Sequence, residues 1–282
     1  MRKVSSAEKG PMARCGPLLT EAQGKKIAPL LPKPPKQRKG GRPWIENRRV
    51  LEGILWILRS GARWQDLPEK FPHPSTCWRR PRDWEERGVW LNIWRRFLSE
   101  LNERQQFRWS ESFLDGSFAS AKKRGCGVGK TKRGKGTKWM VVVDGRGLPL
   151  GKYLHSASPA EVKLAETTLA TIRVGRRHHP GRPRQKPLRV IADKAYDSDP
   201  LRERLRQRGI ELICPHKKNR VRPATPDGRA LRRYRRRWIV KRTNAWLGNF
   251  RRLVVRYDRS LTIYGAFFHI ARFMIVLRRV VQ

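Results

Sequence analysis

A short apolar run that ends on a carboxylate constrains the fold of this chain most strongly. The run covers residues 188–192 and is followed directly by Asp193. Its length, and the proline before it, predict a buried strand rather than a helix. The residues from Asp197 to Pro200 then offer the side-chain cap and the first-turn proline that are typical of a helix start. Asp193 is therefore predicted at the carboxyl end of a strand, where open α/β sheets place their ligands.

A second apolar segment, Phe113 to Phe118, surrounds one more carboxylate, Asp115. Two aspartates on two strands are a candidate metal site, because Mg²⁺ is held mainly through carboxylate oxygens and water. For either aspartate taken alone, capping of a turn is the simpler interpretation.

The order of the predicted elements gives the fold class. After the Asp115 strand, the hairpin of Trp139–Val143 and Leu150–His155 is followed by a helix over 160–172 and by the Asp193 strand. A helix over 200–208, a short strand over 210–214, a long basic helix over 230–251 and a final apolar helix complete the chain. This order predicts an α/β fold with a ribonuclease-H-like mixed sheet flanked by helices.

The residues before this sheet have helical periodicity and predict a small all-α domain of the helix-turn-helix type. We expect a flexible tail over 1–17, a helical DNA-binding domain over 18–104 and a catalytic domain over 105–282. In the helical domain, a Trp- and Arg-rich helix is predicted to lay Arg79, Arg80 and Arg82 on DNA. The alternative is an ordinary helical bundle with a solvated basic face. Pro81 should cost this helix about 3 kcal/mol, so the helix is either kinked or damaged there.

The charge balance indicates the class of partner. The 66 lysines and arginines against 23 acidic residues give a net charge of +43, an excess that predicts a polyanion, and most commonly nucleic acid. A loop rich in glycine and lysine over 122–138 is expected to follow the phosphate backbone through Lys130 and Lys132. This loop resembles a nucleotide-binding P-loop, but Arg124 occupies the position of the required first glycine, which excludes that site. RNA binding is less favoured, because no RNP-type aromatic motif is present.

Several other classes of protein are disfavoured. The four cysteines lie far apart and predict neither a zinc site nor a disulfide framework, so reduced thiols in a cytosolic protein are expected. The adjacent His178 and His179 are expected to be exposed loop residues. The apolar stretch over 261–281 is interrupted by His269 and Arg272, which favours a packed helix over a membrane span. No membrane partner is therefore expected.

Several long motifs, in the same order along the chain, carry a resemblance to a known family. The match runs from about Leu18 to the C-terminus. Its motifs are LTEAQ, RRVLEGILWILRSGARWQDLP, FLDGSF, KTKRGKGTKWMVVVDGRGLPL, VIADKAYDSDPLRERL and RRYRRRWIVKRTNAWLGNFRRL. With these motifs the chain resembles the DDE transposases of bacterial insertion sequences, in the insertion-sequence-five-type branch.

The resemblance implies roles for individual residues. Asp115 and Asp193 correspond to the first two acids of the catalytic triad and are the implied ligands of Mg²⁺ (or Mn²⁺). Tyr234 and Arg237 match the C-terminal signature, where they either orient phosphate or are helix-surface residues. The implied reaction is metal-dependent cleavage and strand transfer at terminal inverted repeats of double-stranded DNA. A homo-oligomer on DNA, associated with the nucleoid, is the implied assembly.

Lys241 stands where the family has the third acid, a glutamate. An ammonium group supplies no lone pair to a metal and adds positive charge where a divalent cation should lie. We therefore expect impaired catalysis, with a non-catalytic DNA-binding remnant that acts as competitor or regulator as the alternative. The side chains of Asp115, Asp193 and Lys241 are expected in one cleft, where the lysine could pair with an aspartate. Another acid could in principle take the role of the missing glutamate. The candidates do not occupy the matching helical position; they are Glu203, Glu211 and Asp227.

Two further differences from the family's usual residues fit a decaying copy of an insertion sequence. Gly24 stands where the family tends to have tryptophan, and Pro81 where it tends to have leucine. Trp246, in the same C-terminal motif as Lys241, is expected to belong to the core.

Overall fold

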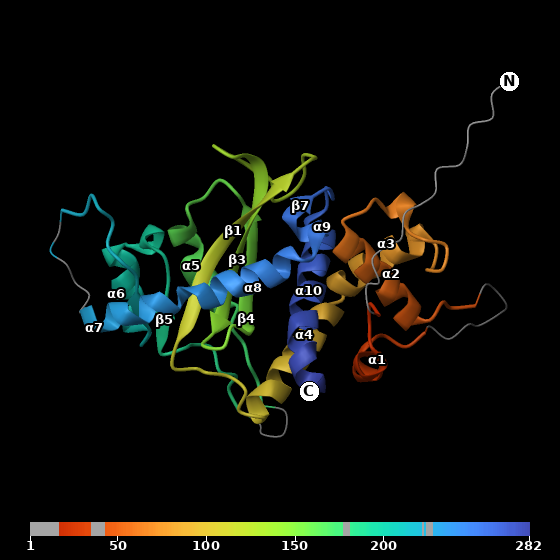
Figure 1. The fold of residues 1–282 in the computed structure, drawn as a ribbon, viewed down its shortest axis with the longest axis horizontal. Coiled ribbons are helices and arrows are strands. Elements are labelled where there is room, and N and C mark those ends of the chain that lie inside the picture. The colour runs from red at the N-terminus through yellow and green to blue at the C-terminus, as the bar shows by residue number, and fades with distance from the viewer. Residues whose placement is uncertain (1–16, 35–42, 177–180, 222, 224–227) are drawn as a thin grey trace.

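The computed structural model describes residues 17–34, 43–176, 181–221, 223 and 228–282. The predicted tail, the two adjacent histidines and Asp227 lie outside these residues, apart from Pro17. The described chain forms one sheet with helices on both faces, beside a group of helices built from both ends of the chain (Figure 1).

A mixed sheet of seven strands is the centre of the molecule. The strands are β1 (Ser112–Ala121), β2 (Gly129–Thr131), β3 (Gly134–Asp144), β4 (Pro149–Ser156), β5 (Arg189–Ile191), β6 (Glu211–Ile213) and β7 (Val255–Arg256). Their order is β2-β3-β1-β5-β6, with β4 also paired to β3 and β7 to β1. β1 is antiparallel to β3 but parallel to β5, which in turn is parallel to β6. The predicted ribonuclease-H-like fold class is confirmed.

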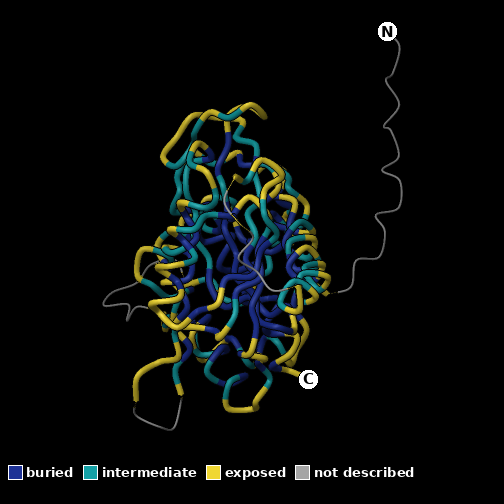
Figure 2. Tube along the Cα trace, turned by 90° about the vertical axis from the view of Figure 1, so that its left-hand side faces the viewer, coloured by how far each residue is buried: buried dark blue, intermediate teal, exposed yellow. Residues whose placement is uncertain are grey.

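The central strands are continuous apolar runs, because helices cover both faces of the sheet and side chains on either face are buried. Trp139 to Val143 in β3 are all buried, as are Val190 and Ile191 in β5. Gly136 allows a close approach between strands, since a Cβ atom there would lie 2.2 Å from the Phe118 ring. Figure 2 shows this buried centre surrounded by exposed loops.

Helices cover the sheet on opposite faces. α8 (Trp238–Gly248) crosses in front of β1 in Figure 1 and contacts it, whereas α5 (Glu161–Ala170) packs on β3 and β4. α6 (Asp199–Gln207) connects β5 to β6. Neighbouring side chains of β1 therefore point to different helices, because side chains alternate along a strand.

Two predicted segments differ from the structure. The long basic helix over 230–251 is divided into α7 (Gly228–Leu231), the 3₁₀ helix η4 (Arg232–Arg237), α8 and α9 (Arg251–Val254). The helical periodicity of this segment predicts one continuous helix. Tertiary contacts change its geometry, because Arg236 binds Glu111, just before β1, and Arg237 binds Asp115 in β1.

The glycine- and lysine-rich segment over 122–138 contains a hairpin instead of being only a mobile loop. β2 pairs with β3, and Gly134, with φ of +98°, forms the turn. Thr131 closes the turn by donating to the Gly134 carbonyl at 3.0 Å and accepting from the Arg133 backbone. Lys130 and Lys132 are exposed on this hairpin.

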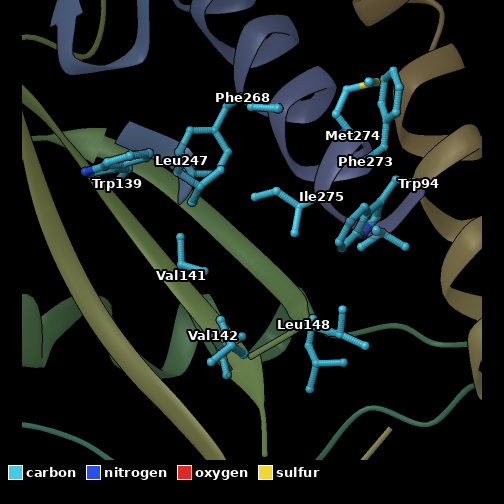
Figure 3. Packing of buried hydrophobic residues seen from close by; sticks show 14 of the residues in the cluster. Trp94, Trp139, Val141, Val142, Leu148, Leu247, Phe268, Phe273, Met274 and Ile275 are labelled. Atoms are coloured by element: carbon cyan, nitrogen blue, oxygen red, sulfur yellow. The ribbon is translucent and has the colours of Figure 1, made fainter. Parts of the chain in front are cut away.

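The helices beside the sheet come from both ends of the chain. The N-terminal ones are α1 (Glu21–Ile27), the short η1 (Ala28–Leu30), α2 (Asn47–Ser60), the short η2 (Trp64–Asp66), α3 (Pro74–Glu86) and α4 (Val89–Glu103). The C-terminal α10 (Leu261–Val281) packs against α3 and α4. Phe273 of α10 stacks on Trp90 with ring centroids 5.7 Å apart, and Figure 3 shows it beside Trp94 and Met274.

α10 is the one helix among the described residues that is long and apolar enough to cross a membrane, judged by length and composition alone. In the fold, 83% of its apolar window is buried, so the predicted packed helix is confirmed. The two polar residues that interrupt it have partners in the core. His269 Nδ1 lies 2.7 Å from Glu85 Oε2, and the Arg272 guanidinium lies 4.1 Å from the Trp94 ring centroid.

A lysine from the sheet completes this buried polar cluster. Lys152 of β4 donates to the Gly265 carbonyl of α10 at 3.3 Å. Burial, and then the charge of Arg272, lower the pKa of Lys152 to about 7. Glu85, Lys152 and His269 therefore connect α3, β4 and α10 through polar contacts inside an apolar core.

Pro81 lies inside α3, which continues without a break from Pro74 to Glu86. Pro81 is buried, and its carbonyl accepts a hydrogen bond of 3.0 Å from Trp90 Nε1. The proline has no backbone N–H to donate to the preceding turn, so the helix lacks one of its own hydrogen bonds there.

We predict that Pro81→Ala raises the free energy of unfolding by about 1–2 kcal/mol, since the restored N–H outweighs the lost ring contacts. Thermal or urea unfolding of the whole chain measures the change. Pro74→Ala is the matched control, because a proline in the first turn of the same helix removes no intrahelical bond. An unchanged or lowered stability of Pro81→Ala would show that the helix tolerates the proline without cost.

Candidate active site

The pairing of two parallel strands brings the two predicted aspartates together. Phe113 of β1 is aligned with Ile191 of β5. Asp115 and Asp193 each lie two residues beyond this pair, so their side chains point to the same face. Neighbouring strands are about 4.8 Å apart, so the two carboxylates are expected side by side at this register, and one guanidinium, that of Arg237, contacts both. The predicted convergence of the two acids is confirmed.

Arg237 joins the two carboxylates. Its Nη2 lies 2.9 Å from Asp115 Oδ1, and its Nη1 lies 2.8 Å from Asp193 Oδ2. The guanidinium side chain is 13% exposed. The planar fork of arginine suits two oxygen acceptors that lie side by side. Burial alone would lower the pKa of Arg237, but the charge and hydrogen bond of Asp115, and then the charge of Asp193, raise it.

Two neighbours complete the environment of this ion pair. Asn244 Nδ2 donates to Asp115 Oδ2 at 3.0 Å, so both oxygens of Asp115 are engaged. Tyr234 accepts a hydrogen bond of 3.3 Å from Arg237 Nη1 through its hydroxyl oxygen. The structure thus places the two signature residues, Tyr234 and Arg237, at the carboxylates. Asn244 was missed from sequence, although its position seven residues after Arg237 puts both on one face of a helix.

Lys241 does not make the contact that was expected of it. It lies on α8 between Arg237 and Asn244, its side chain is exposed, and it forms no ion pair with Asp115 or Asp193. A cation does pair with both aspartates, as expected, but it is Arg237 and not Lys241. Arg237 holds them together, because its longer fork reaches both oxygens from the preceding turn.

A third carboxylate lies on the opposite side of β1. Gly116 faces α5, and a Cβ atom there would lie 2.5 Å from the Glu161 carboxyl carbon. Tyr196 donates to Glu161 Oε2 at 3.0 Å, and burial, followed by the charge of Glu161, raises the pKa of Tyr196. The position of Glu161 beside β1 was not predicted. The one sequence signal for it is Gly116, which lets the Glu161 carboxyl group approach the strand closely.

Two other acids that were considered as replacements are engaged elsewhere. Glu203 pairs with Arg206 at 2.9 Å, and Glu211 pairs with Arg189 at 2.8 Å.

The residues at this site do not fit a two-metal centre. Such a centre needs carboxylate anchors for both ions, whereas Asp115 and Asp193 already neutralise Arg237. Among the residues that the structure describes, no group of three or more acidic, histidine or cysteine side chains could hold a metal ion. The position that the resemblance assigns to the third acid carries a lysine.

The residues predicted to contact DNA in the helical part differ in accessibility. Arg79 is exposed, and Arg82 lies 3.8 Å from Glu86. Arg80 is only 8% exposed, donates to Asn47 Oδ1 at 2.9 Å and stacks 4.0 Å from the Trp44 ring centroid. The prediction that Arg80 lies on DNA is therefore wrong, because its guanidinium is used to join α3 to α2.

Comparison with protein families places this geometry in a known group. Residues 108–275, more than half of the chain, match the family model "Transposase DDE domain", and residues 19–94 match "Putative transposase of IS4/5 family (DUF4096)". The chain belongs to the DDE transposases of the IS4/5 type. Members of this family generally use divalent metal ions.

Relatives in Burkholderia cepacia agree with this assignment. An "Insertion element IS402 uncharacterized 16.2 kDa protein" is 38% identical over 119 residues, which are 41% of this chain and 81% of the relative. A "Putative transposase for insertion sequence element IS402" is 39% identical over 132 residues, 47% of this chain, and is itself covered over 58% of its length. A looser likeness covers 90% of this chain and 71% of a piggyBac transposase in a synaptic complex with hairpin DNA, with a TM-score of 0.49 and 12% identity.

We predict that Asp115→Asn destabilises this transposase by about 1–3 kcal/mol in a buffer with a chelator, because Arg237 is left partly buried beside one carboxylate. In an Arg237→Gln background the same change should cost little or be stabilising, since two unpaired carboxylates repel each other. Thermal unfolding of the four proteins gives this double-mutant cycle.

Glu203→Gln is the control for the loss of a carboxylate, because an exposed pair with Arg206 contributes little. A rise in the unfolding temperature of the single Asp115→Asn variant would contradict the bridge, because it would mean that the two acids repel each other in the native site.

Proposed function

We propose that this chain is an insertion-sequence transposase that binds the terminal inverted repeats of its element but cuts them poorly. The observation that carries this proposal is the Arg237 guanidinium between Asp115 and Asp193, with Lys241 four residues farther along the chain, on α8. The site therefore has two carboxylates, both paired, where the reaction needs three.

The energetic argument concerns what a divalent ion would have to displace. An ion approaching the two aspartates must separate Arg237 from both, and breaking a partly buried pair is costly because one charge is left without a partner. Lys241 adds a second positive charge on the same side of the helix. A glutamate at that position would have attracted the ion and offset Arg237, so the substitution acts twice against metal binding.

DNA binding does not depend on the carboxylates or on a metal ion held by them. The net charge of +43 remains, and Arg79, Lys130 and Lys132 are exposed. These cations are available to the phosphates of double-stranded DNA, both at the element ends and at a target. A homo-oligomer on DNA in the bacterial cytoplasm, associated with the nucleoid, is part of the same proposal.

A second function follows if cleavage is absent altogether. The fold around Lys241 is intact, with Arg237 and Asn244 both in contact with Asp115. A protein that folds and binds element ends without cutting them would compete with intact transposases for the same ends, and would act as a regulator of transposition.

We predict that Lys241→Glu increases Mg²⁺-dependent cleavage of a duplex carrying the element end by on the order of a hundredfold, the equivalent of a few kcal/mol in the transition state. The element ends are taken from the DNA that flanks the coding region. Gel separation of cleaved strands measures the rate. Lys241→Gln is the matched control and should stay inactive, because it removes the ammonium group without supplying a carboxylate.

Binding of the same duplex is measured in parallel. The logarithm of the affinity should fall with the logarithm of the salt concentration by about 0.9 for each phosphate neutralised. If the native chain cuts as fast as Lys241→Glu, impairment is refuted. If binding does not depend on salt, the proposed contact with phosphates is refuted.

A further inference from the structure

Helix α8 carries a second set of aligned side chains that the carboxylate site does not use. Trp238, Arg242 and Trp246 are spaced four residues apart, and the Arg242 guanidinium lies 4.8 Å from the ring centroid of each tryptophan. We call these three residues the aromatic ladder. An α-helix turns about 100° per residue, so residues spaced by four form a continuous stripe along one side.

The ladder lies on a different side of α8 from the carboxylate site. Buried Ile239, Val240, Thr243 and Leu247 hold the helix on the sheet. By the same helical rotation, Arg237 and Asn244 flank this buried face on one side and the ladder flanks it on the other. Lys241 is exposed on the side of the helix away from the sheet, between the carboxylate site and the ladder.

Packing of the core does not explain the ladder. Trp238 is 54% exposed, although burial of a large aromatic side chain is strongly favourable. Trp246 packs partly against the core, so its predicted core position holds for only part of the side chain. Arg242 is fixed in place, because its Nη2 donates to the Arg146 carbonyl at 2.7 Å. The stacked arrangement therefore exists before any partner binds.

A cavity continues the ladder toward the helical part of the molecule. It has a volume of about 920 Å³, and Trp246 lines it together with Trp56 and Phe71. Four arginines from three helices also line it; they are Arg49 and Arg59 of α2, Arg251 of α9 and Arg278 of α10. Aromatic walls with guanidinium groups around them suit a flat base that carries a phosphate.

We propose that the aromatic ladder binds unpaired nucleotides of a DNA strand that crosses α8 and runs toward this cavity. The inference rests on the proposed function, because it takes DNA as the partner. Bases inside a duplex are stacked on each other and cannot reach exposed rings, whereas unpaired bases stack on aromatic side chains whatever their sequence. Lys241, on the side of the helix away from the sheet, is placed to meet the phosphates of the same strand.

The experiment compares two DNA probes with the full chain. One is a fully paired duplex of about 20 base pairs, and the other is the same duplex with about four unpaired nucleotides at one end, one of them 2-aminopurine. Affinity is measured by fluorescence anisotropy in a buffer of fixed salt and without divalent ions. Stacking is measured by quenching of the 2-aminopurine fluorescence.

The variants are Trp238→Ala, Trp238→Phe and Trp44→Ala. Trp44 is the matched control, since it is 41% exposed and stacks 4.0 Å from Arg80 in the helical part. We expect the native chain to prefer the unpaired probe, Trp238→Ala to lose about tenfold in affinity for that probe alone, and Trp238→Phe to keep most of the preference and the quenching.

The outcomes separate this inference from the proposed function. If the native chain binds both probes equally, or if Trp238→Ala keeps the preference and the quenching, the ladder proposal is overturned while DNA binding stands. An equal loss in Trp44→Ala also overturns it, because the effect would then not belong to α8. If the chain binds neither probe, the proposed function and this inference both fail.

Discussion

The two ion pairs of Arg237 determine the properties of this site. Parallel pairing of β1 with β5 places Asp115 beside Asp193, and two ionised carboxylates at that spacing repel each other unless a cation lies between them. In this chain the cation is a side chain of the protein itself. The consequence is a site in which both carboxylates have a partner without any ion from solution, and which has no carboxylate at position 241 to attract one.

The position of α8 follows from the same contacts. Arg237 and Asn244 attach it to Asp115, and its buried residues attach it to the sheet. The remaining surface of the helix is then free to carry other chemistry. A strand of DNA over this helix would meet the carboxylate pair, Lys241 and the aromatic ladder in turn. In the proposed function, the lysine at position 241 would meet the phosphates of that strand.

Much of the fold and part of the site could be predicted from the sequence, for physical reasons that differ between elements. Asp115 and Asp193 were found because short apolar runs report buried strands, and strand alternation fixes the direction of a side chain. Arg80 was misplaced because composition cannot tell a solvated arginine from one that packs on Trp44. The break after Arg237 and the contact of Asn244 depend on tertiary partners, which local periodicity does not contain.

The most direct test of the central claim is the number of Mn²⁺ ions that the native chain holds in the absence of DNA, counted by electron paramagnetic resonance. If Arg237 stays paired with both aspartates, the native chain should hold no Mn²⁺ ion at a site that depends on Asp115. Tight binding of one or two Mn²⁺ ions that disappears in an Asp115→Asn variant would show that the guanidinium yields its place to metal, and would contradict this account.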